Sequence, residues 1–120
     1  MLKEPENVQL KELLSNDERQ ALQELKKRLF DRFPFVRELI LFGSVVHGDA
    51  DEESDVDLLV LTNRKLSRSR RHEITRVTFE INLEYDTNFS VLVADRDKWD
   101  SGMISVLPIH TEIEQHGVPV

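Results

Sequence analysis

Residues 43–57 read GSVVHGDADEESDVD, and the prediction of the fold starts from this stretch. The apolar run VRELILF (36–42) comes directly before it, and the run LLVL (58–61) comes directly after it. Runs of this kind are typical of buried strands, whereas glycines, serines and acidic residues between them are typical of a connection. The stretch therefore joins two predicted strands, one over 36–42 and one over 55–61.

Gly43 and Ser44 follow the first predicted strand without a spacer. A glycine at this point can adopt a positive φ or let the backbone approach a ligand closely. If Ser44 opens a short helical turn, its amide and hydroxyl point outward and form a site for an anion. Taken alone, however, a turn glycine followed by a capping serine is the simpler interpretation.

Asp55 and Asp57 stand two residues apart in the second predicted strand. Because strand side chains alternate, both carboxylates project from one face of the sheet, and Val56 projects from the other. Two like charges at this separation are unfavourable unless a cation bridges them. Mg²⁺ prefers a few carboxylate oxygens completed by substrate phosphate and water, and a pair of such ions can clamp a phosphoryl transfer. Taken alone, the pair could equally be the solvated start of a strand.

The combined pattern is Gly43-Ser44, ten residues, and then Asp55-x-Asp57, with a strand on each side. It resembles the signature of the DNA polymerase beta-like nucleotidyltransferases, and the short chain resembles their minimal, antitoxin-type branch. The resemblance covers about residues 16–120, including the segment FSVLVADRDKWDSGMISVLPIHTEIEQHGVP near the end of the chain. It implies an α/β (α+β) fold, a small mixed sheet with helices packed on it.

The resemblance also implies a reaction and a set of binding residues. The reaction is transfer of a nucleoside monophosphate, AMP from ATP in the first instance, to a hydroxyl acceptor, which could be a helical HEPN-type toxin. By the resemblance, Gly43, Ser44 and His47 hold the nucleoside triphosphate. Asp55 and Asp57 bind Mg²⁺, and two ions are expected.

Two departures from the family's pattern bear on catalysis. His47 stands where many relatives have a basic residue, and its charge is only partial near neutral pH. The family places a third carboxylate on the following strand, where this chain has Asn88, which is neutral and a weaker base. Asp86 could substitute if that strand extended far enough, whereas Asp95 is too distant at ~3.3 Å per residue. The candidate catalytic residues are therefore Asp55, Asp57, Asp86 and Asn88.

Further elements are predicted on either side of these two strands. A capping box of Ser15 with Glu18 opens a helix over about 16–33, and Pro34 ends it. The resulting order, α-β-β-α-β-α, predicts a sheet with its helices on one face. Residues 1–15 are expected to form an arm or short helix before the nucleotidyltransferase domain (16–120). The remaining predicted elements are a helix over about 66–85, a strand over 89–94, a helical segment around Trp99 and a helix over about 108–116.

The composition excludes several classes of protein. A length of 120 residues fits a single domain, and the absence of cysteine excludes disulfides and thiolate metal sites. Sixteen Lys and Arg against 23 Asp and Glu give a net charge of −7, so nucleic acid is not an expected partner. No apolar run approaches the length of a membrane span. We therefore expect a cytoplasmic protein with no membrane association.

Other interpretations remain open from the sequence. The basic run over 64–72 could contact an acidic partner or an RNA acceptor, or could simply be the solvated start of a helix. Asn88 favours a catalytically weak or inactive module that binds a nucleotide or a partner without turnover. A small nucleic-acid-associated protein that uses the basic run is disfavoured by the net charge.

Overall fold

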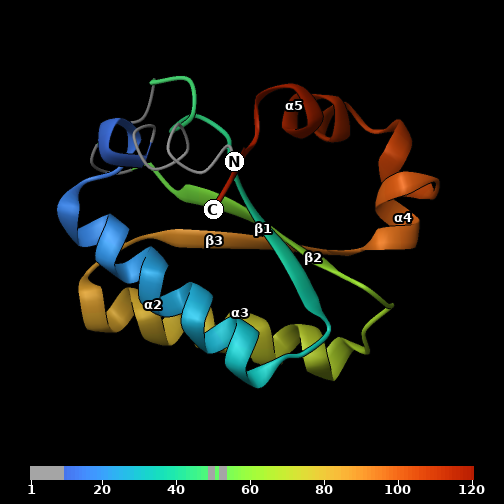
Figure 1. Cartoon of the computed structure of the whole chain (residues 1–120), viewed down its shortest axis with the longest axis horizontal. Coiled ribbons are helices and arrows are strands. Elements are labelled where there is room, and N and C mark those ends of the chain that lie inside the picture. The colour runs from blue at the N-terminus through green and yellow to red at the C-terminus, as the bar shows by residue number, and fades with distance from the viewer. Residues whose placement is uncertain (1–9, 49–50, 52–53) are drawn as a thin grey trace, which may run out of the picture.

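The computed structural model describes residues 10–48, 51 and 54–120. Residues 10–13 are helical, and the rest of the predicted N-terminal arm lies outside the described residues. The elements then follow in the order shown in Figure 1. They are α2 (Asn16–Arg32), β1 (Val36–Phe42), β2 (Val56–Thr62), α3 (Arg68–Tyr85), β3 (Phe89–Asp95), α4 (Arg96–Asp100), the 3₁₀ helix η1 (Met103–Val106), α5 (Pro108–His116) and β4 (Val118–Pro119).

The first helix confirms the predicted capping box. The Glu18 amide donates to the Ser15 hydroxyl at 3.1 Å, and the Ser15 amide donates to the Glu18 carboxylate at 2.9 Å. These two bonds satisfy backbone donors that the first turn of a helix leaves free. The helix ends at Arg32, and Phe33, the residue before Pro34, is its C-cap. The other predicted helices and strands are also present, with bounds within two residues of those expected.

The sheet is mixed, which confirms the predicted fold class. Its strand order is β3-β2-β1-β4, with β1 antiparallel to both β2 and β4 and β2 parallel to β3. The edge strand β4 has only two residues, which pair with Ile40 and Leu41 of β1, and no sequence pattern predicts it. Strand β3 reaches its parallel place beside β2 through the crossover helix α3.

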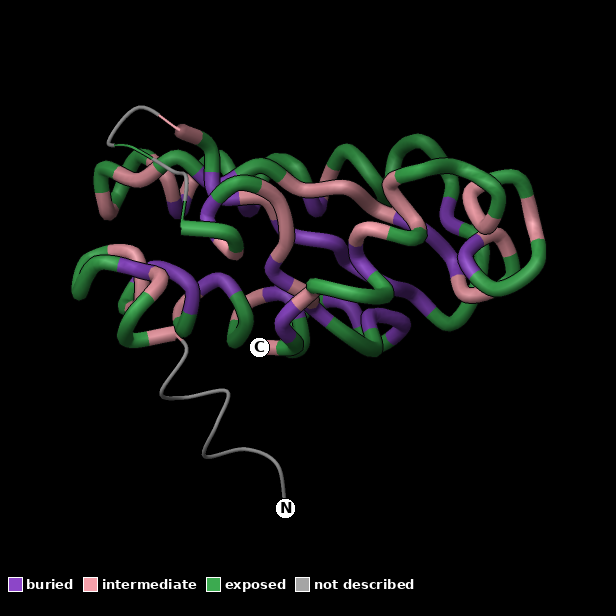
Figure 2. Tube along the Cα trace, turned by 90° about the horizontal axis from the view of Figure 1, so that it is seen from above, coloured by how far each residue is buried: buried purple, intermediate pink, exposed green. Residues whose placement is uncertain are grey.

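The prediction that the helices lie on one face is wrong, because helices cover both faces (Figure 1). Leu58 and Val60 of β2 pack in a core with α2 and α3, whereas Leu59 and Leu61 pack with α4 and α5. A run of apolar residues without alternation requires cover on both faces of the strand. Figure 2 shows the buried central segments enclosed by more exposed ones. Among the described residues, none of the helices has the length and apolar character needed to span a membrane.

Candidate active site

The two predicted carboxylates lie at the edge of the sheet where β1 ends and β2 begins. Asp57 is the second residue of β2 and pairs with Phe42 of β1. Asp55 immediately precedes the strand and is exposed, whereas Asp57 is half-buried. Side-chain alternation places both carboxylates on the face that Leu59 shares with α4 and α5, and Val56 lies on the opposite face with α2 and α3.

Gly43 gives the Asp57 carboxylate the space that it occupies. Its φ is +87°, in the left-handed region that glycine adopts without strain. A β carbon built at this position would overlap Asp57 Oδ2. The end of β1 therefore requires a glycine for two separate reasons, its backbone conformation and its contact with the acid.

Residues 44–48 form a helical turn directly after Gly43. The amides of Val46, His47 and Gly48 donate to carbonyls three residues earlier, at 3.1 to 3.3 Å. Ser44 opens this turn and is exposed, and its amide and hydroxyl have no hydrogen-bond acceptor among the described residues. Amides at the start of a helical turn are suited to binding phosphate oxygens.

The pKa of Asp57 is raised above its ordinary value. Burial, which disfavours the charged form, is the larger cause, and repulsion by Asp55 is the second. The site therefore holds its negative charge at an energetic cost that a bound cation would relieve.

The beginning of β3 places two neutral side chains beside the two acids. The Asn88 side-chain amide donates to Asp55 Oδ1 at 2.5 Å, and the Asn88 carbonyl accepts from the Val56 amide at 2.9 Å. Ser90 pairs with Asp57 in the parallel ladder, so both side chains lie on the same face. Asn88 is a residue that the sequence predicts for the site, whereas Ser90 is not, because its position depends on the register between strands.

Asp86 does not lie in a strand, contrary to what its substitution for a third carboxylate requires. It is the left-handed C-cap of α3, with φ 54° and ψ 49°, and β3 begins three residues later at Phe89. With Asn88 it lines an open depression of about 970 Å³ that Asp55 and Asp57 do not line. Asp95 lies at the opposite end of β3, beside Thr62, as its distance along the chain predicted.

Asn82 of α3 fixes the connection that presents Asn88 and Ser90. Its side-chain carbonyl accepts from the Phe89 amide at 2.8 Å and from the Thr87 hydroxyl at 3.1 Å. Its side-chain nitrogen donates to the Phe89 carbonyl at 3.0 Å. This polar residue in a helix gave no signal in the sequence, because its partners follow it by five to seven positions.

His47 contacts α5. Its Nε2 lies 2.6 Å from Glu112 Oε2, and its ring packs edge-on against His116 with the centroids 5.0 Å apart. The contact ties the turn that follows Gly43 to the helix on the same side of the sheet. To bind a phosphate oxygen through Nε2, His47 would have to leave Glu112.

Comparison with known proteins identifies the family that carries this arrangement. The nucleotidyltransferase domain family matches residues 22–106, which include Gly43, Ser44, Asp55 and Asp57. The chain belongs to the nucleotidyltransferase family. The chain is 33% identical over 82 residues to a candidate protein adenylyltransferase of Methanocaldococcus jannaschii, a match that covers 68% of this chain and 76% of that protein.

Solved structures show the same nucleotidyltransferase fold. A toxin–antitoxin structure with AMP-PNP superposes with a TM-score of 0.58 at 20% identity, covering 88% of this chain and 72% of that one. The MntA–HepT toxin–antitoxin structure gives a TM-score of 0.53 at 18% identity, covering 84% and 69%. At these identities the similarity concerns the fold.

The acidic pair of this nucleotidyltransferase has the donor chemistry for a divalent cation. Mg²⁺ is held by one or two carboxylates, with substrate phosphate and water completing its shell. Asp55 and Asp57 have carboxylates of this kind, and burial together with repulsion by Asp55 raises the pKa of Asp57. Among the residues that the structure describes, no three His, Cys, Asp or Glu side chains gather in a metal-binding group. The residues present therefore fit a cation whose remaining ligands come from a bound nucleotide and water.

Proposed function

We propose that this nucleotidyltransferase transfers AMP from ATP to a hydroxyl group on a partner protein. The observation that carries the proposal is the placing of Asp57 against Gly43, which puts the acidic pair beside the exposed turn that begins at Ser44. An anion site and a cation site then lie next to each other, as binding of a metal–nucleotide complex requires.

Each residue has a physical role in this proposal. The Ser44 amide and hydroxyl donate to the triphosphate, and the glycine before it lets phosphate oxygens approach the backbone. Asp55 and Asp57 hold Mg²⁺, which when bound would neutralise charge on the phosphate oxygens. Asn88 holds Asp55 in place through the 2.5 Å hydrogen bond. His47 adds a phosphate donor once it leaves Glu112.

The reaction exchanges one phosphoester bond for another. The acceptor oxygen bonds to the α-phosphorus, the bond from that phosphorus to the α–β bridging oxygen breaks, and pyrophosphate leaves. Neither Ser90 nor Asn88 offers a carboxylate to accept the proton of the hydroxyl. Asp55, Asn88 and Ser90 are all exposed at this edge, so water there accepts it.

The relatives support a protein as the acceptor. The Methanocaldococcus relative is named for protein adenylylation, and the structural neighbours are complexes of an antitoxin with a toxin. A helical, HEPN-type toxin is the partner that we propose.

A second candidate function follows from two neutral residues, Asn88 directly before β3 and Ser90 within it. With Ser90 beside Asp57 and Asn88 beside Asp55, neither strand neighbour adds a carboxylate to these two acids. Such a site could bind a metal–nucleotide complex, or the partner, without turnover. This alternative keeps the same binding residues and differs only in the absence of transfer.

The test is to incubate the full chain with the co-encoded toxin, ATP and Mg²⁺, and to weigh both proteins by intact-mass spectrometry. We expect a gain of one AMP on the toxin and release of pyrophosphate, and neither with Asp57→Asn. Nucleotide binding without any mass gain, for each of the four ribonucleotides, would instead establish the binding module. Failure to bind any nucleotide would contradict both functions.

A further inference from the structure

The outer face of α3 carries a continuous row of exposed side chains. We propose that this row is a docking surface for an acidic, amphipathic helix of the partner protein. This inference deepens the proposed function, on which it rests, by naming the surface that holds the partner. We call the row the α3 stripe, and it consists of Arg68, His72, Arg76, Phe79 and Leu83.

The spacing of the α3 stripe places its members on one side of the helix. They are separated by steps of four, four, three and four residues, which at about 100° per residue span an arc of about 80°. The core face of α3 is on the opposite side and holds Ile74, Val77, Thr78 and Ile81, all of them buried. The α3 stripe is thus outside the packing that forms the domain.

The C-terminal half of the α3 stripe is apolar. Phe79 is 60% exposed and Leu83 is 69% exposed, although each is large enough to gain substantially from burial. They stand four residues apart, so they are neighbours on the helix surface. Adjacent exposed apolar side chains on a helix face are the kind of anchor that a partner helix covers.

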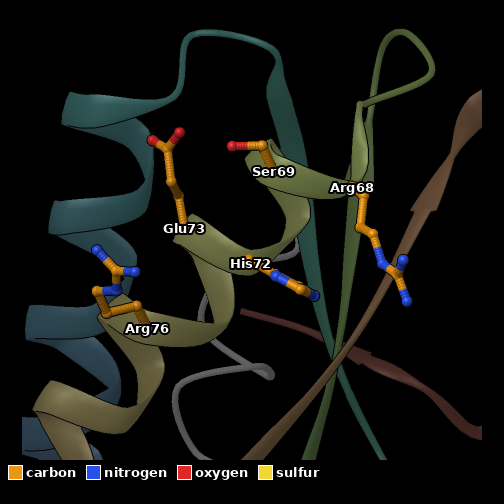
Figure 3. A pocket seen from close by; sticks show the side chains of 5 residues that line it. All are labelled: Arg68, Ser69, His72, Glu73 and Arg76. Atoms are coloured by element: carbon orange, nitrogen blue, oxygen red, sulfur yellow. The ribbon is translucent and has the colours of Figure 1, made fainter.

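The N-terminal half of the α3 stripe is cationic. Arg68, His72 and Arg76 line an open depression of about 610 Å³ together with Ser69 and Glu73 (Figure 3). Glu73 pairs with Arg70 at 3.5 Å, whereas Arg68 and Arg76 form no ion pair within the described part of the chain. The first turn of α3 contains no acidic residue, so its arginines lie at the positive end of the helix dipole. Arg68, which lies in that first turn, therefore does not stabilise the helix through its dipole.

Charge and length together define the occupant. From Arg68 to Leu83 the α3 stripe rises about 22 Å, which matches roughly four turns of a partner helix. Carboxylates on the first half of that helix and apolar residues on its second half would complement the two halves of the stripe. RNA would leave Phe79 and Leu83 without a partner of their own chemistry, and a second copy of the stripe lacks the carboxylates that its cations need.

The orientation of the α3 stripe would bring a docked partner close to the proposed site of AMP transfer. Its apolar end approaches the edge of the sheet that carries Asp55 and Asp57, because α3 ends at Tyr85 and β3 begins at Phe89. However, α3 packs on the face opposite to the two acids. A partner on the stripe therefore leaves the nucleotide site open while one end of it lies near that edge.

The test is photocrosslinking in the cells that carry the gene. The full chain is given a benzophenone amino acid at position 79, or at position 106 as the control. Val106 is 80% exposed and apolar, and it lies on η1 across the sheet from α3 (Figure 1). We expect an adduct from position 79 alone, to a helical protein segment with acidic and apolar residues three or four positions apart. An adduct to RNA, to a second copy or to a segment without acids would overturn the proposal, as would equal adducts at both positions or none.

Binding to the purified partner gives an independent measurement. Arg76→Glu and Phe79→Ser should each weaken binding of the partner at least tenfold, whereas Val106→Ser should change it less than twofold. All three variants should bind ATP with an affinity within twofold of the parent. Unaltered binding by the first two variants would contradict the docking surface. Binding that depends on the α3 stripe without AMP transfer would support the docking surface and contradict the proposed transferase activity. AMP transfer that Arg76→Glu does not reduce would support the transferase activity and contradict the docking surface.

Discussion

Ser90 of β3 lies beside Asp57 of β2 in the parallel ladder, and both side chains emerge on the face that also carries Asp55. A hydroxyl therefore occupies the position from which a third carboxylate would reach the acidic pair. The nearby Asn88 donates its side-chain amide to Asp55 and so holds that carboxylate in place. Among the described residues at the start of β3, therefore, no carboxylate is added to Asp55 and Asp57.

We expect Ser90→Asp to raise the affinity for Mn²⁺ or Mg²⁺ at least tenfold, equivalent to about 1.4 kcal/mol. The added carboxylate would lie beside Asp57 and increase the charge that a divalent cation neutralises. Calorimetric titration of the metal in the presence of a non-hydrolysable ATP analogue measures the change. Ser90→Asn, which adds bulk without charge, should leave the affinity near that of the parent. Equal metal affinities for the two variants would show that position 90 does not face the cation.

Gly43→Ala should destabilise the fold by about 1–3 kcal/mol in urea unfolding, because the residue has a positive φ and its β carbon would meet Asp57. Gly48→Ala is the matched control, since Gly48 also has a positive φ, +75°, but a β carbon there meets no atom of the described residues within 4 Å. Gly48→Ala should lower the free energy of unfolding only by the cost of the strained backbone conformation, about 1 kcal/mol. If the two variants lose the same stability, Gly43 is required for its backbone conformation alone.

Asp57→Asn should stabilise the metal-free protein near pH 7, raising Tm by about 2–4 °C. The folded protein holds the Asp57 proton more tightly than the unfolded chain does, because the pKa is raised by burial and by Asp55. Ionisation therefore costs stability as pH rises through that pKa, and the cost is absent at lower pH. Thermal unfolding at about pH 3 should accordingly show no gain.

The control for this prediction is Asp55→Asn. It removes the same repulsion but also replaces the charged acceptor of the Asn88 hydrogen bond with a neutral amide oxygen, so its gain should be smaller. A loss of stability in Asp57→Asn at neutral pH would mean that the carboxylate makes a favourable interaction in the metal-free protein.

Glu112→Gln should increase the affinity for ATP about two- to threefold, because a neutral amide holds His47 less tightly than the carboxylate does. Since the pair is exposed, the change in unfolding free energy should stay below about 0.5 kcal/mol. Titration with a fluorescent ATP analogue gives the affinity. In a His47→Ala background the same substitution should have little effect, and an equal gain there would show that Glu112 acts through its charge alone.

The local elements could be predicted because their signals lie within a few residues. Ser15 and Glu18 specify the start of α2, and the residue before Pro34 ends it. The apolar runs at 36–42 and 58–61 specify β1 and β2. The run in β2 even contains a signal for cover on both faces, because its apolar residues do not alternate with polar ones. The two-residue strand β4 is too short for any periodicity to show.

The sequence by itself determined that two acids share one face of a strand after a Gly-Ser turn, because side-chain alternation within a strand is a local property. Only the tertiary structure decided which residues face those acids. The register of β3 against β2 puts Ser90 beside Asp57 and Asn88 beside Asp55, and a shift of one residue would have turned both side chains to the other face. The pairing of His47 with Glu112, and the exposure of one side of α3, likewise depend on how distant elements pack, and no spacing along the chain encodes them.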